Sequence, residues 1–165
     1  MSPETVTVAK PYHVASGEGL ADVWWKSGRI TVKTAGAETG NAFSQIETDD
    51  PRDSGPPLHL HHNEDETFYV LEGTPTFRLG DDTIVAGPGD FVNVPKGTPH
   101  CFRNASDAPV RMILTFTPSG IEKFFEETLE RAYDLSQPCP DNLDEVGARY
   151  AAAAPRYGLE FFLDA

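Results

Sequence analysis

Cysteine is scarce in this chain of 165 residues, where only Cys101 and Cys139 occur. Their spacing matches no metal-binding cysteine motif, and two cysteines do not suggest a disulfide scaffold. Long apolar runs are also missing, and no basic segment followed by an apolar stretch opens the chain. We therefore expect neither a signal peptide nor a membrane span. These absences favour a cytoplasmic protein with reduced thiols.

Basic residues are the second shortage. Thirteen lysines and arginines stand against 26 acidic residues, which gives a net charge of -13. Such a chain repels nucleic acid and anionic membrane surfaces, so we expect neither as a partner. The charge does not restrict a small-molecule substrate, because a buried pocket need not share the sign of the surface.

Glycine and proline are plentiful, with 14 of each scattered between short apolar segments. This pattern indicates many turns between short strands, and therefore an all-β body. One domain is expected at this length, with an N-terminal arm at 1–19, the β body at 20–117 and a helical C-terminal extension at 118–165. Residues 49–57 are expected to form a solvated loop. The segments with strand character are 20–25, 29–34, 41–48, 59–61, 66–71, 75–79, 83–86, 90–94, 100–104 and 110–116.

Beyond residue 118 the apolar pattern takes the period of a helix. Ser119 and Glu122 fit a capping box, and apolar residues then recur at helical spacing as far as Ala132. A second helix is expected from Asn142 until Pro155 ends it. The apolar tail at 159–163 is predicted to dock on the β body or on a partner chain.

Two histidines and a glutamate carry the first sign of chemistry. Residues two apart in a strand share a face, so His59 and His61 should project together. The polar segment 62–65 is turn-like, and two short antiparallel strands around it could bring Glu66 to the same place. Two imidazoles and a carboxylate on one inward face predict a site for a first-row transition metal.

His100 is the candidate for a fourth ligand. It begins a strand after a turn with two prolines and a glycine, which restricts the direction of its side chain. Three imidazoles and one carboxylate would leave one or two positions for water, substrate or dioxygen. Closed structural zinc sites are more often rich in cysteine, so an open site fits better. Alternation predicts that His62, Tyr69 and Cys101 face away from the site.

These residues carry a family resemblance. The motif G-x5-H-x-H-x3,4-E-x6-G is matched at His59, His61, Glu66 and Gly73, although Asp53 stands at the position of its first glycine. The second motif, G-x5-P-x-G-x2-H-x3-N, is matched throughout by Gly89, Pro95, Gly97, His100 and Asn104. With both motifs, the chain resembles the cupins, in the single-domain bacterial group similar to quercetin dioxygenase.

The resemblance implies a jelly-roll barrel of two antiparallel sheets. It also implies that His59, His61, Glu66 and His100 bind one divalent transition metal ion, for which zinc, nickel, iron, cobalt and manganese are the candidates. By analogy with quercetin dioxygenases, Glu66 would also take the hydroxyl proton of a small aromatic substrate, and the reaction would consume dioxygen. A homodimer is expected on the same grounds.

Cupin folds host many chemistries, so two other functions stay open. One is a metal-dependent isomerase or cyclase that does not use oxygen, and the other is a non-catalytic module that holds a small ligand. Either would use the same interior. Five apolar residues most simply fill that interior, and some of them would line a substrate pocket: Phe68, Phe102, Met112, Leu114 and Phe116.

Overall fold

The computed structural model describes residues 10–134 and 136–163. Residues 1–9 of the expected N-terminal arm lie outside these ranges, and residues 10–19 form no helix or strand. None of the helices formed by the described residues is long and apolar enough to cross a membrane.

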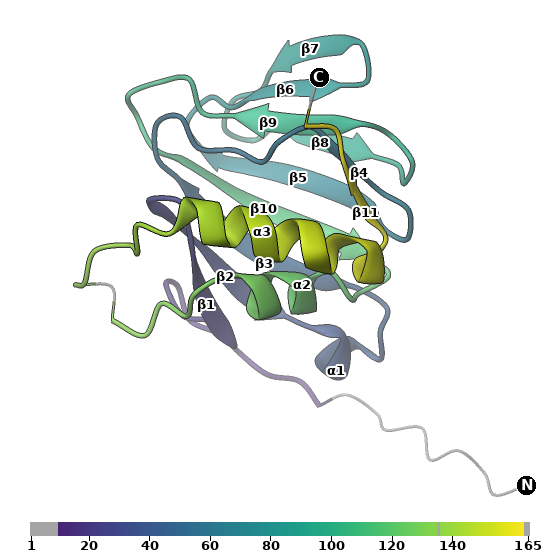
Figure 1. Cartoon of the computed structure of the whole chain (residues 1–165). Helices are drawn as coiled ribbons and strands as arrows, with labels where there is room; N and C mark the ends of the chain where they lie inside the picture. Colours follow the sequence, from purple (N-terminus) through teal and green to yellow (C-terminus); the bar gives the residue numbers. More distant parts are fainter. Residues whose placement is uncertain (1–9, 135, 164–165) are drawn as a thin grey trace, which may run out of the picture.

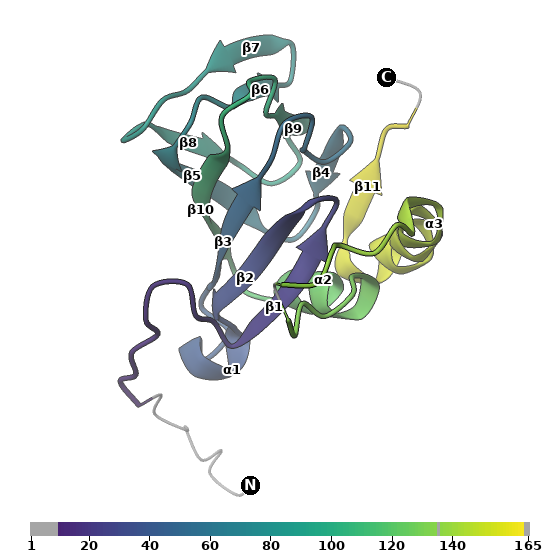
Figure 2. The ribbon, with the colours of Figure 1, turned by 90° about the vertical axis from the view of Figure 1, so that its left-hand side faces the viewer.

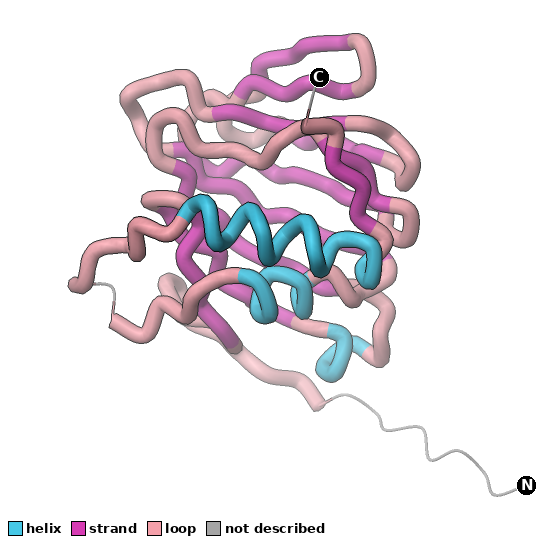
Figure 3. The backbone as a smooth tube through the Cα atoms, viewed as in Figure 1, coloured by secondary structure: helices cyan, strands magenta, loops and turns pink. Residues whose placement is uncertain are grey.

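Strands dominate the structure and form two antiparallel sheets (Figures 1 and 3). The six-stranded sheet has the order β1-β2-β3-β10-β5-β8, and the five-stranded sheet has the order β11-β4-β9-β6-β7. Each predicted strand is present, with ends shifted by a few residues at most. The strands are β1 (Ala21–Trp25), β2 (Gly28–Thr34), β3 (Ser44–Asp50), β4 (His59–His61), β5 (Asp65–Glu72), β6 (Thr76–Leu79), β7 (Asp82–Val85), β8 (Phe91–Val94), β9 (His100–Arg103), β10 (Val110–Thr117) and β11 (Leu159–Phe161).

The apolar core fills the space between the two sheets. Phe68 and Met112 reach it from the six-stranded sheet, and Phe77 and Phe102 reach it from the five-stranded sheet. Within the described ranges no strand pairing joins one sheet to the other, so the predicted barrel is not closed by hydrogen bonds. The two sheets are therefore joined through side-chain contacts, most of them apolar.

Helices gather on one side of the sheets, where α2 and α3 lie next to each other (Figure 3). The predicted second helix is present as α3, which begins after Asn142 and runs into a short 3-10 turn at Pro155. A short helix at 36–39 was not expected. The helical elements are α1 (Gly36–Thr39), α2 (Glu122–Thr128), α3 (Leu143–Ala153) and η1 (Ala154–Tyr157).

The prediction for the start of α2 is wrong. Ser119 does not cap this helix, which begins at Glu122 after Ile121. The buried Glu122 carboxylate instead accepts hydrogen bonds from the backbone N–H groups of Gly36, at 3.0 Å, and Gly120, at 2.7 Å. Glu122 therefore ties the α1 turn to the segment that leads into α2.

The apolar spacing also predicted too long a helix. Helix α2 ends at Thr128, and the next residues run along the edge of the six-stranded sheet. There the N–H of Trp24 donates to Glu130 O, and the N–H of Ala132 donates to Asp22 O, at 2.8 and 2.9 Å. Pairing with the unpartnered edge of β1 satisfies backbone groups that a longer helix would have satisfied internally.

The C-terminal tail docks on the β body, as predicted, and adds a strand to it. Figure 2 shows β11 beside β4, with α3 on its outer side. In this pairing Leu159 lies opposite His61, and Phe161 lies opposite His59. The tail thus packs against the strand that carries two of the candidate metal ligands.

Residues 49–57 are not wholly a solvated loop. Strand β3 continues to Asp50, whose residue surface is 0% exposed. Ser54 Oγ donates a hydrogen bond to one carboxylate oxygen at 2.9 Å, and Oδ2 has no hydrogen-bond partner within the described chain. Asp50 is thus a buried carboxyl group at the end of a core strand.

Candidate metal centre

The four predicted ligands meet between the two sheets. His59 and His100 are direct cross-strand partners on β4 and β9, and His61 lies two residues along β4. Glu66 approaches from β5, which belongs to the other sheet. The expected pairing of the strand at 59–61 with the strand at 66–71 is therefore wrong, although the convergence that it was meant to explain is present.

The geometry of this cluster fits a metal site. One nitrogen or oxygen from each of the four side chains lies within 4.8 Å of the other three, and all four residues are buried. Glu66 Oε2 lies 2.8 Å from His100 Nε2 and 3.2 Å from His61 Nε2. Two ligands each about 2.1 Å from one ion can be at most about 4.2 Å apart, so small side-chain rotations suffice to surround an ion.

Backbone carbonyls orient two of the imidazole rings. His59 Nδ1 lies 2.9 Å from Pro57 O, and His100 Nδ1 lies 2.8 Å from Thr98 O. A carbonyl oxygen can only accept, so both Nδ1 atoms carry a proton and both Nε2 atoms face the cluster. Such hydrogen bonds fix the tautomer and the ring angle of metal-binding histidines.

A second glutamate supports His61, and the sequence reading missed it. Glu64 is 4% exposed, and its Oε2 lies 3.4 Å from His61 Nδ1. The two atoms make no hydrogen bond of good geometry, and neither has another partner within the described chain. The negative charge beside Nδ1 nevertheless favours the ring orientation that turns Nε2 toward the cluster, and it increases the basicity of the imidazole. The signal was available, since Glu64 precedes Glu66 by two residues and could share its face. The turn-like composition of 62–65 concealed it.

Burial and charge act against each other in the cluster. Burial, together with the neighbouring His100, lowers the pKa of His59 to about 3. Burial also disfavours the charged form of His61, but contacts with Glu64 and Glu66 outweigh it and raise the pKa of His61 to about 9. Burial would raise the pKa of Glu66, yet hydrogen bonds to His100 and His61 hold it well below its usual range. The cluster thus balances a buried carboxylate with a proton on imidazole, and a bound cation would displace that proton.

Asp53 stands where the first motif has its first glycine. Asp53 has φ of 64°, in the left-handed region where glycine is favoured and aspartate is tolerated. Its carboxylate accepts a hydrogen bond from Arg103 Nη2 at 2.7 Å. Asp53 thus takes a glycine-like backbone conformation and is held in it by Arg103.

A cavity of about 60 Å³ adjoins the cluster. Four of the five predicted interior residues, Phe68, Phe102, Leu114 and Phe116, line it together with His59, His61 and Glu66. Met112 is fully buried in the core and is not among the lining residues.

The predicted outward residues lie away from the site. His62 is exposed, and its Nε2 lies 2.8 Å from Glu160 Oε2. Tyr69 is 46% exposed, and Cys101 is half-buried with a free thiol. The alternation rule therefore separated His62 correctly from its neighbour His61.

Comparison with known proteins agrees with this fold and this site. The family model described as "Cupin domain" matches residues 45–116, the segment that holds all four clustered residues. This segment of the chain is a cupin domain. Over 154 residues, 93% of its length, this cupin is 28% identical to quercetin 2,3-dioxygenase of Bacillus subtilis (strain 168).

The cupin spans about half the length of the curated relatives that it matches, and 45% of the Bacillus subtilis protein. Among solved structures, a predicted oxalate decarboxylase from Thermotoga maritima has a TM-score of 0.59 at 18% identity, covering 65% of this chain and 99% of that one. KdgF from Halomonas sp. has a TM-score of 0.53 at 17% identity, covering 59% and 86%. At these identities the similarity shows the fold alone.

Proposed function

We propose that this cupin is a metal-dependent dioxygenase that acts on a small hydroxylated aromatic compound. The observation that carries the proposal is the buried His59–His61–Glu66–His100 cluster, which opens on an aromatic-lined cavity. The sequence similarity to a quercetin 2,3-dioxygenase supports the choice of chemistry.

The ligand set defines the class of metal. Three neutral imidazoles and one carboxylate suit zinc, nickel, iron, cobalt or manganese in the divalent state. Ions that prefer oxygen ligands, such as magnesium, are poorly matched to this set of donors. When bound, such an ion supplies a Lewis acid that stabilises negative charge on a substrate oxygen. His59 and His100 are held ready for this by their Nδ1–H bonds to backbone carbonyls.

Glu66 is the residue placed to handle a proton. Its carboxylate is ionised because the histidine contacts hold its pKa low, and it is 4% exposed beside the cavity. A substrate hydroxyl entering the cavity would find this carboxylate as its proton acceptor. The aromatic side chains of Phe68, Phe102 and Phe116 would exclude water and pack on a flat ring.

Oxygen consumption tests the proposal. Protein loaded separately with each candidate metal is mixed with the flavonol quercetin, and oxygen uptake and quercetin loss are measured. We expect uptake that requires metal and falls at least 100-fold in Glu66→Gln, because general-base catalysis contributes factors of this order. Product formation without oxygen would identify an isomerase or cyclase, and tight binding without turnover would identify a binding module. Either result would refute the dioxygenase proposal.

A further inference from the structure

The cavity beside the metal cluster is too small for the substrate class proposed for it. Pockets for drug-sized ligands measure roughly 300–1,000 Å³, whereas this cavity of about 60 Å³ has room for only a few water molecules. A flat aromatic substrate therefore needs more space than the interior of the sheets provides.

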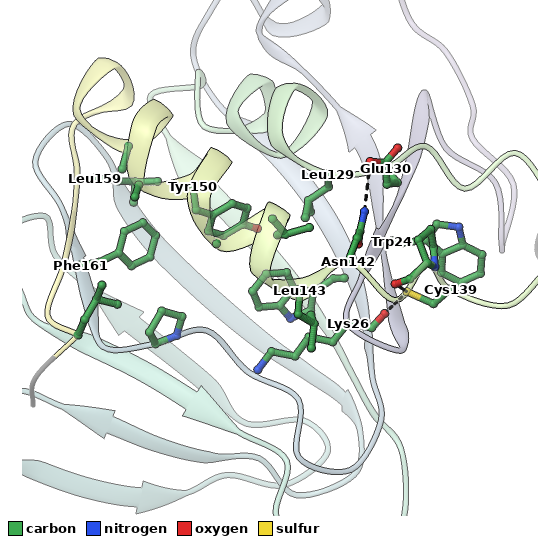
Figure 4. Close-up of a pocket in the computed structure, with 18 of the residues that line it drawn as sticks. Trp24, Lys26, Leu129, Glu130, Cys139, Asn142, Leu143, Tyr150, Leu159 and Phe161 are labelled. Atoms are coloured by element: carbon green, nitrogen blue, oxygen red, sulfur yellow. Dashed lines mark hydrogen bonds between the residues drawn. The ribbon is translucent and has the colours of Figure 1, made fainter.

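That space lies directly outside, in an apolar groove of about 670 Å³ (Figure 4). Its walls come from the end of β1, residues 129–130 and 139–143, helix α3 and strand β11. The groove and the inner cavity have four lining residues in common, which are Trp25, Tyr150, Leu159 and Phe161. One layer of side chains thus separates the two spaces.

This layer is mostly aromatic and reaches the cluster itself. The rings of Trp25 and Tyr150 stack with their centroids 5.6 Å apart, and those of Tyr150 and Phe161 stack at 6.0 Å. The Phe161 ring lies 5.8 Å from the ring of His59. Phe161 belongs to a three-residue strand at the edge of its sheet. Such a strand has few backbone hydrogen bonds, so it can move at low cost.

Tyr150 carries the one feature of the layer that indicates a ligand. It is 8% exposed, and its hydroxyl lies near that of Thr128 but makes no hydrogen bond of good geometry within the described chain, since Thr128 Oγ1 donates to Phe124 O instead. In Figure 4 the side chain lies beside α3, between Phe161 and Leu129. A buried hydroxyl without a partner is unfavourable, and a ligand oxygen that accepted its proton would remove that cost.

We propose that the groove and the inner cavity form one binding pocket when the ring of Phe161 swings aside, and that Tyr150 selects the ligand by donating a hydrogen bond to one of its oxygens. The ligand is a flat aromatic molecule with at least one carbonyl or phenolic oxygen. Its body lies in the groove, and its reactive end reaches His59 and Glu66. This inference rests on the proposed function for its substrate class.

The first test measures binding without turnover. Metal-loaded protein is titrated with quercetin by calorimetry in the absence of oxygen. We expect Tyr150→Phe, which keeps the ring and removes only the hydroxyl, to bind about 3- to 10-fold more weakly, the effect of one hydrogen bond. Phe91→Ala removes an exposed aromatic ring on β8 and serves as the control with unchanged affinity. Absence of binding to the unsubstituted protein, or equal affinity in Tyr150→Phe, overturns the inference.

The second test needs no substrate. The rate at which EDTA removes the metal is compared for the unsubstituted protein, Phe161→Ala and Phe91→Ala. Phe161→Ala should release metal at least 10-fold faster at a temperature at which all three proteins are folded, because the layer beside His59 is opened. Equal rates in all three proteins contradict the inference.

These outcomes separate the inference from the proposed function. If quercetin binds in a Tyr150-dependent manner but oxygen is not consumed, the dioxygenase proposal fails and the pocket stands. If oxygen uptake keeps its KM in both Tyr150→Phe and Phe161→Ala, the pocket fails and the dioxygenase proposal stands.

Discussion

Asp50 makes this cupin less stable at neutral pH than it would be with an uncharged residue at that position. Burial raises the pKa of Asp50 from 3.8 to about 6, and the nearby charge of Asp49 adds to the rise. The hydroxyls of Thr48 and Ser54 and the ammonium group of Lys26 act in the opposite direction but do not cancel it. The folded protein therefore holds a proton that the unfolded chain releases at lower pH.

The sign and size of the effect follow from this difference. Between about pH 4 and pH 6 the folded state binds more protons than the unfolded state, so stability falls as pH rises. The contribution of the protonated carboxyl to the free energy of unfolding is fully present below about pH 4 and is lost above about pH 6. A difference of about two pKa units corresponds to about 3 kcal/mol.

Asp50→Asn tests this reasoning, because the amide resembles the protonated carboxyl and can still accept the bond from Ser54 Oγ. Urea unfolding at pH 4, 5, 6 and 7 gives the free energy of unfolding of both proteins. The difference in free energy of unfolding, variant minus original protein, should be about 3 kcal/mol larger at pH 7 than at pH 4. The exposed Asp81→Asn is the control, which removes a carboxylate from the surface instead of the core. A constant difference for Asp50→Asn would refute the reasoning.

Two other substitutions test contacts that support the site and the fold. Glu64→Gln should lower the affinity for zinc about 10- to 100-fold in calorimetry, because it removes the carboxylate that orients His61; affinity equal to that of the exposed control Glu18→Gln would contradict this. Glu122→Ala should lower the free energy of unfolding in urea by about 2–4 kcal/mol, since the N–H groups of Gly36 and Gly120 lose a charged acceptor. A loss below about 0.5 kcal/mol would contradict that role.

The strands were predictable because their signals are local. Alternating apolar residues and turn sequences mark each strand from β1 to β10, and alternation alone distinguished the buried His61 from the exposed His62. The metal cluster was found for a related reason, since its residues stand at motif positions that a single sequence displays.

Pairing between distant segments was not predictable in the same way. Nothing local indicates that β4 and β5 belong to different sheets, or that residues 130–132 pair with β1 instead of extending α2. Asp50 was read as part of a solvated loop because its neighbours are polar, yet its burial depends on Ser54 and on the packing of the whole core. Tertiary contacts decide such positions and override local composition.

Metal content is the measurement that tests the central claim most directly. The purified protein and three variants are saturated with zinc or nickel, freed of excess metal and analysed for bound ion. We expect about one ion per chain in the unsubstituted protein and in His62→Ala, whose side chain is exposed, and far less in His59→Ala and His100→Ala. Full retention of metal in both His59→Ala and His100→Ala would contradict the assignment of the site.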